Sequence, residues 1–194
     1  MQRHLPMKLT WTTPAERDAA QWDCTRACRI LPDHRKHAAV ARLAADADVD
    51  VPTSVPLMYS PMSWDDAREA ERHGMTFGPH TVTHPILARA SNAQSRFEIE
   101  ESWRRLKDQM ATPVPVFCYP NGQEGDYGKR EMDVIGSAGM TGSVIGSSGY
   151  ATGDDIRHPQ NRYRIKRFSM PDTTGDLIQY VTGLERLKDR IRGR

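Results

Sequence analysis

Apolar positions along this chain recur with helical spacing in its first third, and alternate between helix-like segments and short apolar runs afterwards. A helix is predicted over residues 14–29, between a Thr-Pro start and a Leu-Pro stop. A second amphipathic helix is predicted over residues 35–47, where apolar residues fall three and four positions apart. Three prolines in residues 48–61 then favour a linker. We therefore expect a helical hairpin and linker over residues 1–60, appended to a main body.

In the rest of the chain, Ser and Gly residues mark the starts and stops of alternating helices and strands. The predicted helices cover residues 64–73, 91–110, 126–138 and 174–192. The predicted strands cover residues 75–78, 114–119, 140–145 and 163–170, and a Gly-rich polar loop covers residues 147–161. Such alternation favours a parallel α/β sheet or barrel, although four strands are few for a closed barrel. We expect one α/β domain over residues 61–194.

Composition and charge exclude several classes of function. The 194 residues carry 27 Lys and Arg against 25 Asp and Glu, and a net charge of +2 gives no reason to expect nucleic acid or a membrane surface as partner. No apolar run is long enough to span a membrane, and the first residues lack the apolar core of a secretory signal. As written, the sequence predicts a cytoplasmic protein. An envelope or extracellular location stays open if a leader precedes this sequence.

Three cysteines do not form an even disulfide framework. Cys24 and Cys28 lie one helical turn apart, close in sequence to His34 and His37. The spacer between these pairs is much shorter than in the usual zinc finger. We therefore interpret the two cysteines as small residues on a helix face, and rank a zinc module there last among the functional hypotheses.

A pair of histidines carries the clearest chemical signal. His80 and His84 are four residues apart, directly after a predicted strand and just before Pro85. In parallel α/β folds the ends of strands are where sites are built, and Pro85 disfavours helical geometry at His84. Two imidazoles on one turn are suited to binding a single divalent metal. The alternative is that the two histidines are polar loop residues without a function.

A second polar turn follows the next predicted strand. Tyr119-Pro120-Asn121-Gly122 would lie on the same rim as the histidines, because the carboxyl ends of parallel strands share one edge. A Pro-Asn-Gly turn exposes backbone N–H groups, which can stabilise an oxyanion. An ordinary turn that leaves a core strand explains the same residues equally well.

Taken in order, the runs over residues 75–85 and 117–122 resemble the second and third motifs of the polysaccharide deacetylases, the NodB-homology domain of carbohydrate esterase family 4. Residues 98–102 resemble the helix between those motifs, and residues 138–140 the turn before the next strand. The resemblance covers roughly residues 61–187.

The resemblance implies a fold, a reaction and a metal. The fold would be a partial (β/α) barrel of the polysaccharide deacetylase type, and the reaction the hydrolysis of N-acetyl groups on a polysaccharide or amino sugar. In this family an Asp-His-His set binds zinc or another divalent metal, and a second Asp is the general base. His80 and His84 match the two histidine ligands, and Tyr119, Pro120, Asn121 and Gly122 match the wall of the substrate groove. The implied partners are a divalent metal, zinc first, and an N-acetylated carbohydrate.

The sequence also departs from the family pattern. The motif that supplies the base and the aspartate ligand is not found, so the catalytic residues stay unassigned. Asp65 and Asp66 fit a helix cap better than this role. Cys118 stands where many members have an arginine. The late Leu-x-His motif is not apparent; Arg167 lies in that region as an accessory candidate, and His158 lies in a loop before it.

Three hypotheses follow from the missing aspartate. In the first, the chain is an N-terminally incomplete metal-dependent deacetylase. In the second, it is a catalytically inactive relic that retains a carbohydrate-binding rim. In the third, another copy of the chain donates the aspartate, so a homo-oligomer stays open.

Overall fold

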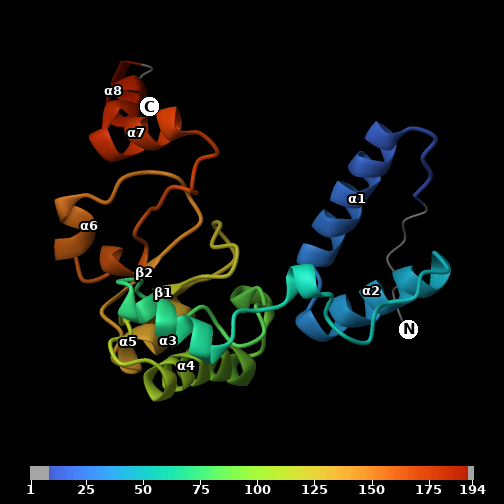
Figure 1. Ribbon diagram of the computed structural model, residues 1–194, viewed down its shortest axis with the longest axis horizontal. Coiled ribbons are helices and arrows are strands. Elements are labelled where there is room, and N and C mark those ends of the chain that lie inside the picture. Colours follow the sequence, from blue (N-terminus) through green and yellow to red (C-terminus); the bar gives the residue numbers. More distant parts are fainter. Residues whose placement is uncertain (1–8, 192–194) are drawn as a thin grey trace.

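The computed structural model describes residues 9–191 as a helix-rich chain with one small parallel sheet (Figure 1). In chain order the elements are α1 (Pro14–Arg29), α2 (Asp33–Asp46), η1 (Leu57–Tyr59), α3 (Trp64–Arg72), η2 (Leu87–Arg89), α4 (Asn92–Gln109), β1 (Val116–Cys118), α5 (Lys129–Ser137), β2 (Gly142–Val144), α6 (Gly153–Arg157), η3 (Asn161–Tyr163), α7 (Thr174–Thr182) and α8 (Leu184–Ile191). None of these helices is both long and apolar enough to cross a membrane.

The two N-terminal helices form a hairpin beside the main body (Figure 1). Thr13 caps α1 by accepting from the N–H of Glu16, whose carboxylate accepts from the Thr13 N–H in return. The helix predicted over residues 14–29 is confirmed, and α2 begins two residues earlier than expected. An ion pair between Arg29 and Asp126 at 3.0 Å links this hairpin to the body. The division at residue 60 stays a prediction.

Helices α3 and α4 begin where their caps predict, whereas α5 begins at Lys129, three residues later than expected, because the chain enters it through Gly128. The hydroxyl of Ser63 accepts from the N–H of Asp66 at the start of α3, and Ser91 caps α4 in the same way. The chain leaves α3 through Gly74, which has a φ of +90°. Local sequence therefore determined the bounds of these helices.

The strand expected over residues 75–78 is absent from the sheet. The segment runs extended beside β1, and the N–H groups of Val114 and Cys118 donate to the carbonyls of Phe77 and Pro79 at 2.8 and 2.9 Å. Pro79 has no N–H to donate in return, which interrupts any regular ladder. The segment still brings the residues that follow it to the carboxyl end of β1.

The sheet consists of β1 and β2, which are parallel, with Phe117 opposite Ser143. The expected strands over 114–119 and 140–145 are therefore present but shorter. The strand expected over residues 163–170 is reduced to one bridge, between Val144 and Ile165. The reason is that the η3 turn immediately before it takes the backbone out of the extended region.

The expected (β/α) barrel is not confirmed, although the expected α/β alternation is present. In the order α4, β1, α5, β2, the two parallel strands are connected through α5, and α4 packs against α5. Closure into a barrel needs many more tilted strands than the two that the described residues contribute.

The hydrophobic core lies between α4, α5 and the sheet. Phe117, Tyr119, Ile99 and Ile135 are fully buried at its centre. The other buried members are Ala67, Leu87, Trp103, Leu106, Met110, Tyr127, Val134, Met140, Ile145 and Tyr163. The faces of α4 and α5 that cover the sheet therefore contribute to this core together with β1 and the loops around the sheet.

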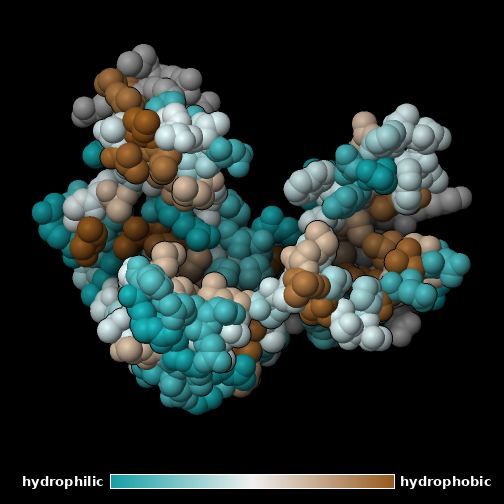
Figure 2. All heavy atoms as spheres, viewed as in Figure 1, coloured by the Kyte–Doolittle hydropathy of each residue, from teal (hydrophilic) through white to brown (hydrophobic). Residues whose placement is uncertain are grey.

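The C-terminal part differs from expectation in two places. The helix expected over residues 174–192 breaks at Gly183, whose φ of +79° ends α7 before α8 begins; residue 192 itself lies outside the described residues. The loop expected over residues 147–161 contains the short helix α6. Figure 2 shows apolar surface on α7 and α8, where Ile178, Val181, Leu184 and Leu187 are exposed.

Aromatic side chains attach α7 to the body. Phe168 stacks on Tyr180 with ring centroids 4.4 Å apart, and meets Tyr150 edge to face at 4.7 Å. The hydroxyl of Tyr150 donates to the carbonyl of Tyr180 at 3.0 Å. This cluster fixes the segment that carries Arg167.

Candidate metal-binding site

The imidazole of His80 is oriented by the backbone of β1. Its Nδ1 lies 2.7 Å from the carbonyl oxygen of Cys118, and since a carbonyl only accepts, Nδ1 carries the proton. The lone pair of the neutral ring is then on Nε2. Histidines that bind metals are commonly fixed in this way, with the second ring nitrogen donating to a carbonyl.

The second histidine stands beside the first. The ring centroids of His80 and His84 are 4.9 Å apart, with an angle of 76° between the ring planes. Both residues are exposed, so the rings are open to an ion from solvent. The structure thus brings together the two ligands that the sequence predicts, on one turn.

Electrostatics favour the neutral form of His80. Packing around the ring lowers its pKa, and the charges of His84 and Arg167 lower it further, against the raising effect of the Cys118 carbonyl. A neutral imidazole is the form that binds a metal. The ring is therefore prepared as a ligand at neutral pH.

The turn that carries the pair has unusual backbone geometry. Thr81 and His84 have φ values of +67° and +58°, in the left-handed region that non-glycine residues rarely adopt. The Thr81 hydroxyl accepts from the His84 N–H at 3.1 Å and donates to the His80 carbonyl. Such strain in a surface turn is a feature of functional sites.

A buried carboxylate that sequence reasoning did not single out lies behind this turn. Glu98 of α4 accepts hydrogen bonds from Val82 and Thr83, the residues between Thr81 and His84. One signal was present in the sequence. Glu98 falls at a core-facing position of α4, in register with Ser95, Ile99, Ser102 and Leu106, where a charged residue is rare.

Tyr119 is part of the core and does not line a groove. Its ring is fully buried, stacks on Tyr127 at 4.2 Å, and its hydroxyl donates to the Tyr163 carbonyl at 3.3 Å. Burial raises the pKa of this phenol well above its usual value. Its N–H donates to the Val144 carbonyl at 3.2 Å. The described geometry therefore gives Tyr119 a structural place.

The rest of the expected turn leaves one donor available. Pro120 is buried and has no N–H, and the Gly122 N–H donates to the Pro120 carbonyl. Asn121 is exposed with a φ of +57°, and its N–H has no hydrogen-bond partner in the described part of the chain. Of the four expected residues, Asn121 is thus the one whose N–H can reach a ligand.

Arg167 lies on the same rim. Its Nε donates to the carbonyl of Ile145 at 3.2 Å, at the end of β2. Its charge is close enough to lower the pKa of Cys118, although burial raises that pKa more. The structure places this accessory candidate near the pair, whereas no described contact joins His158 to it.

No carboxylate within residues 9–191 joins the two histidines in a candidate metal site. Asp66 accepts from the N–H and hydroxyl of Ser63, which lower its pKa, and Asp65 pairs with Arg68 at 2.6 Å. Both aspartates therefore stabilise the first turn of α3, as expected. The described residues hold no group of three or more His, Cys, Asp or Glu side chains that could bind a metal. This finding includes Cys24 and Cys28 with His34 and His37, where a zinc module was the hypothesis ranked last.

The donor set fits a divalent metal in part. Two imidazoles supply two of the three protein ligands that a catalytic zinc site usually has, and the Nδ1 of His80 is held by the backbone. A cavity of about 200 Å³ adjoins His80. Its lining consists of Trp64, Gly78, Pro79, His80, Thr81, Val82, Ser102, Arg105 and Leu106.

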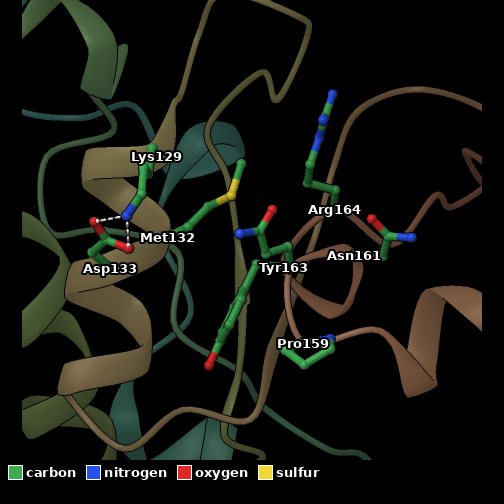
Figure 3. A pocket seen from close by; sticks show the side chains of 8 residues that line it. Lys129, Met132, Asp133, Pro159, Asn161, Tyr163 and Arg164 are labelled. Atoms are coloured by element: carbon green, nitrogen blue, oxygen red, sulfur yellow. Dashed lines mark hydrogen bonds and ion pairs between the residues drawn. The ribbon is translucent and has the colours of Figure 1, made fainter.

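A larger cavity of about 320 Å³ lies between α5 and η3 (Figure 3). Lys129 and Asp133 form an ion pair on one wall, at 2.6 and 2.8 Å, and Arg164 lies on the other. None of the predicted site residues lines it. We therefore take the smaller cavity beside His80 as the one connected with the candidate chemistry.

Comparison with known proteins agrees with the motifs. A sequence model of the polysaccharide deacetylase family matches residues 18–143, from within α1 to β2. The fold is similar to that of the Streptococcus pyogenes deacetylase PplD in complex with acetate, with 21% sequence identity and a TM-score of 0.53. That similarity covers 73% of this chain and 63% of PplD, so the chain spans less than two thirds of its length. A search of curated proteins found no match.

Proposed function

Since the chain belongs to the polysaccharide deacetylase family, we propose that it is a metal-dependent hydrolase that removes acetyl groups from an N-acetylated carbohydrate. The observation that carries the proposal is the histidine pair, with Nδ1 of His80 fixed on the Cys118 carbonyl and the ring of His84 beside it. Two such ligands after an extended segment suit a hydrolytic metal site.

Each residue of the site has a defined task in this proposal. His80 and His84 hold a divalent ion, with zinc as first choice. When bound, the ion supplies a Lewis acid for the amide carbonyl and lowers the pKa of water. The free N–H of Asn121 donates to the carbonyl oxygen of the substrate as charge develops on it. The guanidinium of Arg167 adds positive charge on the same rim.

The proposal assigns no general base. Glu98 is unsuited to the task because it is 2% exposed and both of its oxygens accept hydrogen bonds from the histidine turn. Asp65 and Asp66 are engaged at the start of α3. The carboxylate that activates water in this family has no counterpart beside the pair within the described residues.

Acetate release tests the proposal directly. The full chain is incubated with zinc and chitin oligosaccharides, and free acetate is measured against the chain with His80→Ala. We expect release that depends on zinc and is lost in the variant. Release that persists in His80→Ala, or in the presence of a chelator, would contradict the assignment of the site.

A second candidate function is carbohydrate binding without hydrolysis. It is favoured by one observation, the lack of a third metal ligand within residues 9–191. The two functions differ in a single experiment: a chain that binds the oligosaccharide in calorimetry but releases no acetate with zinc supports the binding function.

A further inference from the structure

The carboxylate of Glu98 lies behind the histidine turn, and we propose that it is a positioning residue that holds His80 and His84 in their metal-binding arrangement. The inference rests on the proposed metal site and adds to it. Glu98 itself makes no contact with the ion or substrate in this assignment, because its oxygens face the turn.

Three short hydrogen bonds join Glu98 to the residues between the two histidines. Oε2 accepts from the N–H groups of Val82 and Thr83 at 2.7 and 2.8 Å, and Oε1 accepts from the Thr83 hydroxyl at 2.5 Å. Hydrogen bonds to an ionised acceptor are stronger than neutral ones, and those inside a protein are less weakened by water. Glu98 thereby ties the turn to α4, a long helix anchored in the core.

The turn needs such an anchor because its backbone is strained. Thr81 and His84, on either side of the two residues that Glu98 binds, have positive φ values. For the β-branched Thr81 this conformation is particularly unfavourable, so the surroundings must enforce it. Without the anchor we expect the turn to relax toward ordinary backbone angles and the two rings to move apart.

The charge of Glu98 supports the same role. No Lys or Arg within residues 9–191 forms an ion pair with it, so its negative charge is balanced by N–H and O–H groups alone. That negative charge would favour a cation held by the two imidazoles of the same turn. Glu131 offers a contrast: it is also 2% exposed, but Arg130 pairs with it at 2.6 Å.

Zinc titration calorimetry on the full chain separates positioning from stability. We compare the unchanged chain with Glu98→Gln and, as matched control, Glu131→Gln, whose carboxylate binds Ser95 and Gly128 and does not touch the turn. Glu98→Gln should weaken zinc binding by about tenfold or more, as expected for a residue that orients ligands. Glu131→Gln should lower the melting temperature and leave the zinc affinity within about twofold.

A second pair of variants probes the turn from its other side. Thr83→Ser keeps the hydroxyl that donates to Glu98, whereas Thr83→Val removes it at nearly constant volume. We expect zinc affinity to be retained in Thr83→Ser and reduced about threefold in Thr83→Val, in line with one lost charge-assisted hydrogen bond. These variants decide the question if Glu98→Gln does not fold.

The outcomes distinguish the inference from the proposed function. An unchanged chain that binds no zinc overturns both. A chain that binds zinc, with unchanged affinity in Glu98→Gln and Thr83→Val and only a lower melting temperature, overturns the role of Glu98 and leaves the metal site standing. Loss of affinity in Glu131→Gln equal to that in Glu98→Gln would also overturn it.

Discussion

Nδ1 of His80 donates to the carbonyl oxygen of Cys118 across 2.7 Å, so the tautomer of the histidine is determined by the backbone of β1. A carbonyl is present whatever side chain position 118 carries. The cysteine that replaces the arginine of many family members therefore does not disturb this contact. What orients His80 is the extended segment 75–79 lying against β1, and the ring keeps Nε2 available for a metal.

The first prediction concerns the histidine pair. His80→Ala and His84→Ala should each weaken zinc binding by about 10- to 100-fold, because one imidazole alone is a poor site for this ion. Calorimetry with zinc measures the change. His73→Ala is the control, since His73 lies on the end of α3 and pairs with Glu69 at 2.9 Å. Unchanged affinity in either site variant would contradict the assignment.

Substitution of Gly122 tests the turn that follows β1. The φ of this residue is +68°, and a Cβ would lie 2.6 Å from the Gly146 nitrogen, so Gly122→Ala should lower the free energy of unfolding by about 3 kcal/mol. Gly125 has a φ of +87° but open space around it, and Gly125→Ala should cost about 1 kcal/mol. Urea unfolding compares the two; equal losses would mean that the close contact does not matter.

Helices were predictable because their signals are local. Thr13, Ser63 and Ser91 each cap the helix that follows, through a hydrogen bond to a residue three positions later. The turn that carries the histidines was predictable for a similar reason, since Pro79 and Pro85 enclose it, although the segment before it is not a strand of the sheet. Cap and turn chemistry depends on neighbours in sequence, and a single sequence shows those.

Strands and burial depended on partners far along the chain. Ile165 makes one bridge to Val144 where a longer strand was expected, because the preceding turn η3 limits the pairing. Tyr119 was expected in the wall of the substrate groove, yet its side chain contacts Tyr127 and Tyr163 inside the core. The role of Glu98 needed the histidine turn and α4 to be placed together. Such contacts follow from tertiary packing, which local propensity does not determine.

A carboxylate outside the site gives a prediction on pH. Glu71 accepts from the N–H groups of Ala111 and Thr112, which lower its pKa from 4.5. Because the ionised form is favoured in the folded state, its stabilisation is complete above pH 4.5 and is lost as the pH falls through the lower pKa. Glu71→Gln should therefore lower the melting temperature at neutral pH, and the difference should shrink in acid.

The control for this pH series is Glu100→Gln. Glu100 forms only an exposed ion pair with Arg96 at 2.9 Å, so its loss should change the melting temperature little at any pH. A difference between the unchanged chain and Glu71→Gln that stays constant from neutral to acid pH would show that the Glu71 charge is not involved.

The place of Tyr119 in the core has its own test. Tyr119→Phe removes the hydroxyl that donates to the Tyr163 carbonyl, which also accepts from Ser143 and so keeps a partner. We expect the free energy of unfolding to fall by about 0.5–1 kcal/mol. Acetate release per folded molecule should not change. Unchanged stability with reduced acetate release in this variant would contradict the structural role of Tyr119 and support a place for it in the substrate groove.

The charge of Arg167 should oppose a bound cation. Besides burial, this guanidinium contributes to the lowered pKa of His80, and its Nε is held by the Ile145 carbonyl at 3.2 Å. Removing a positive charge near the pair should strengthen zinc binding, by about threefold at low ionic strength and less in added salt. Arg167→Gln measured by calorimetry at two salt concentrations tests this. Lys166→Gln is the matched control, because the charge of Lys166 acts on Asp155 of α6.

The proposed reaction gives Arg167→Gln a second expected effect. If Arg167 also stabilises negative charge on the substrate, the Arg167→Gln variant binds zinc more tightly and releases acetate more slowly. General loss of structure would not produce that combination.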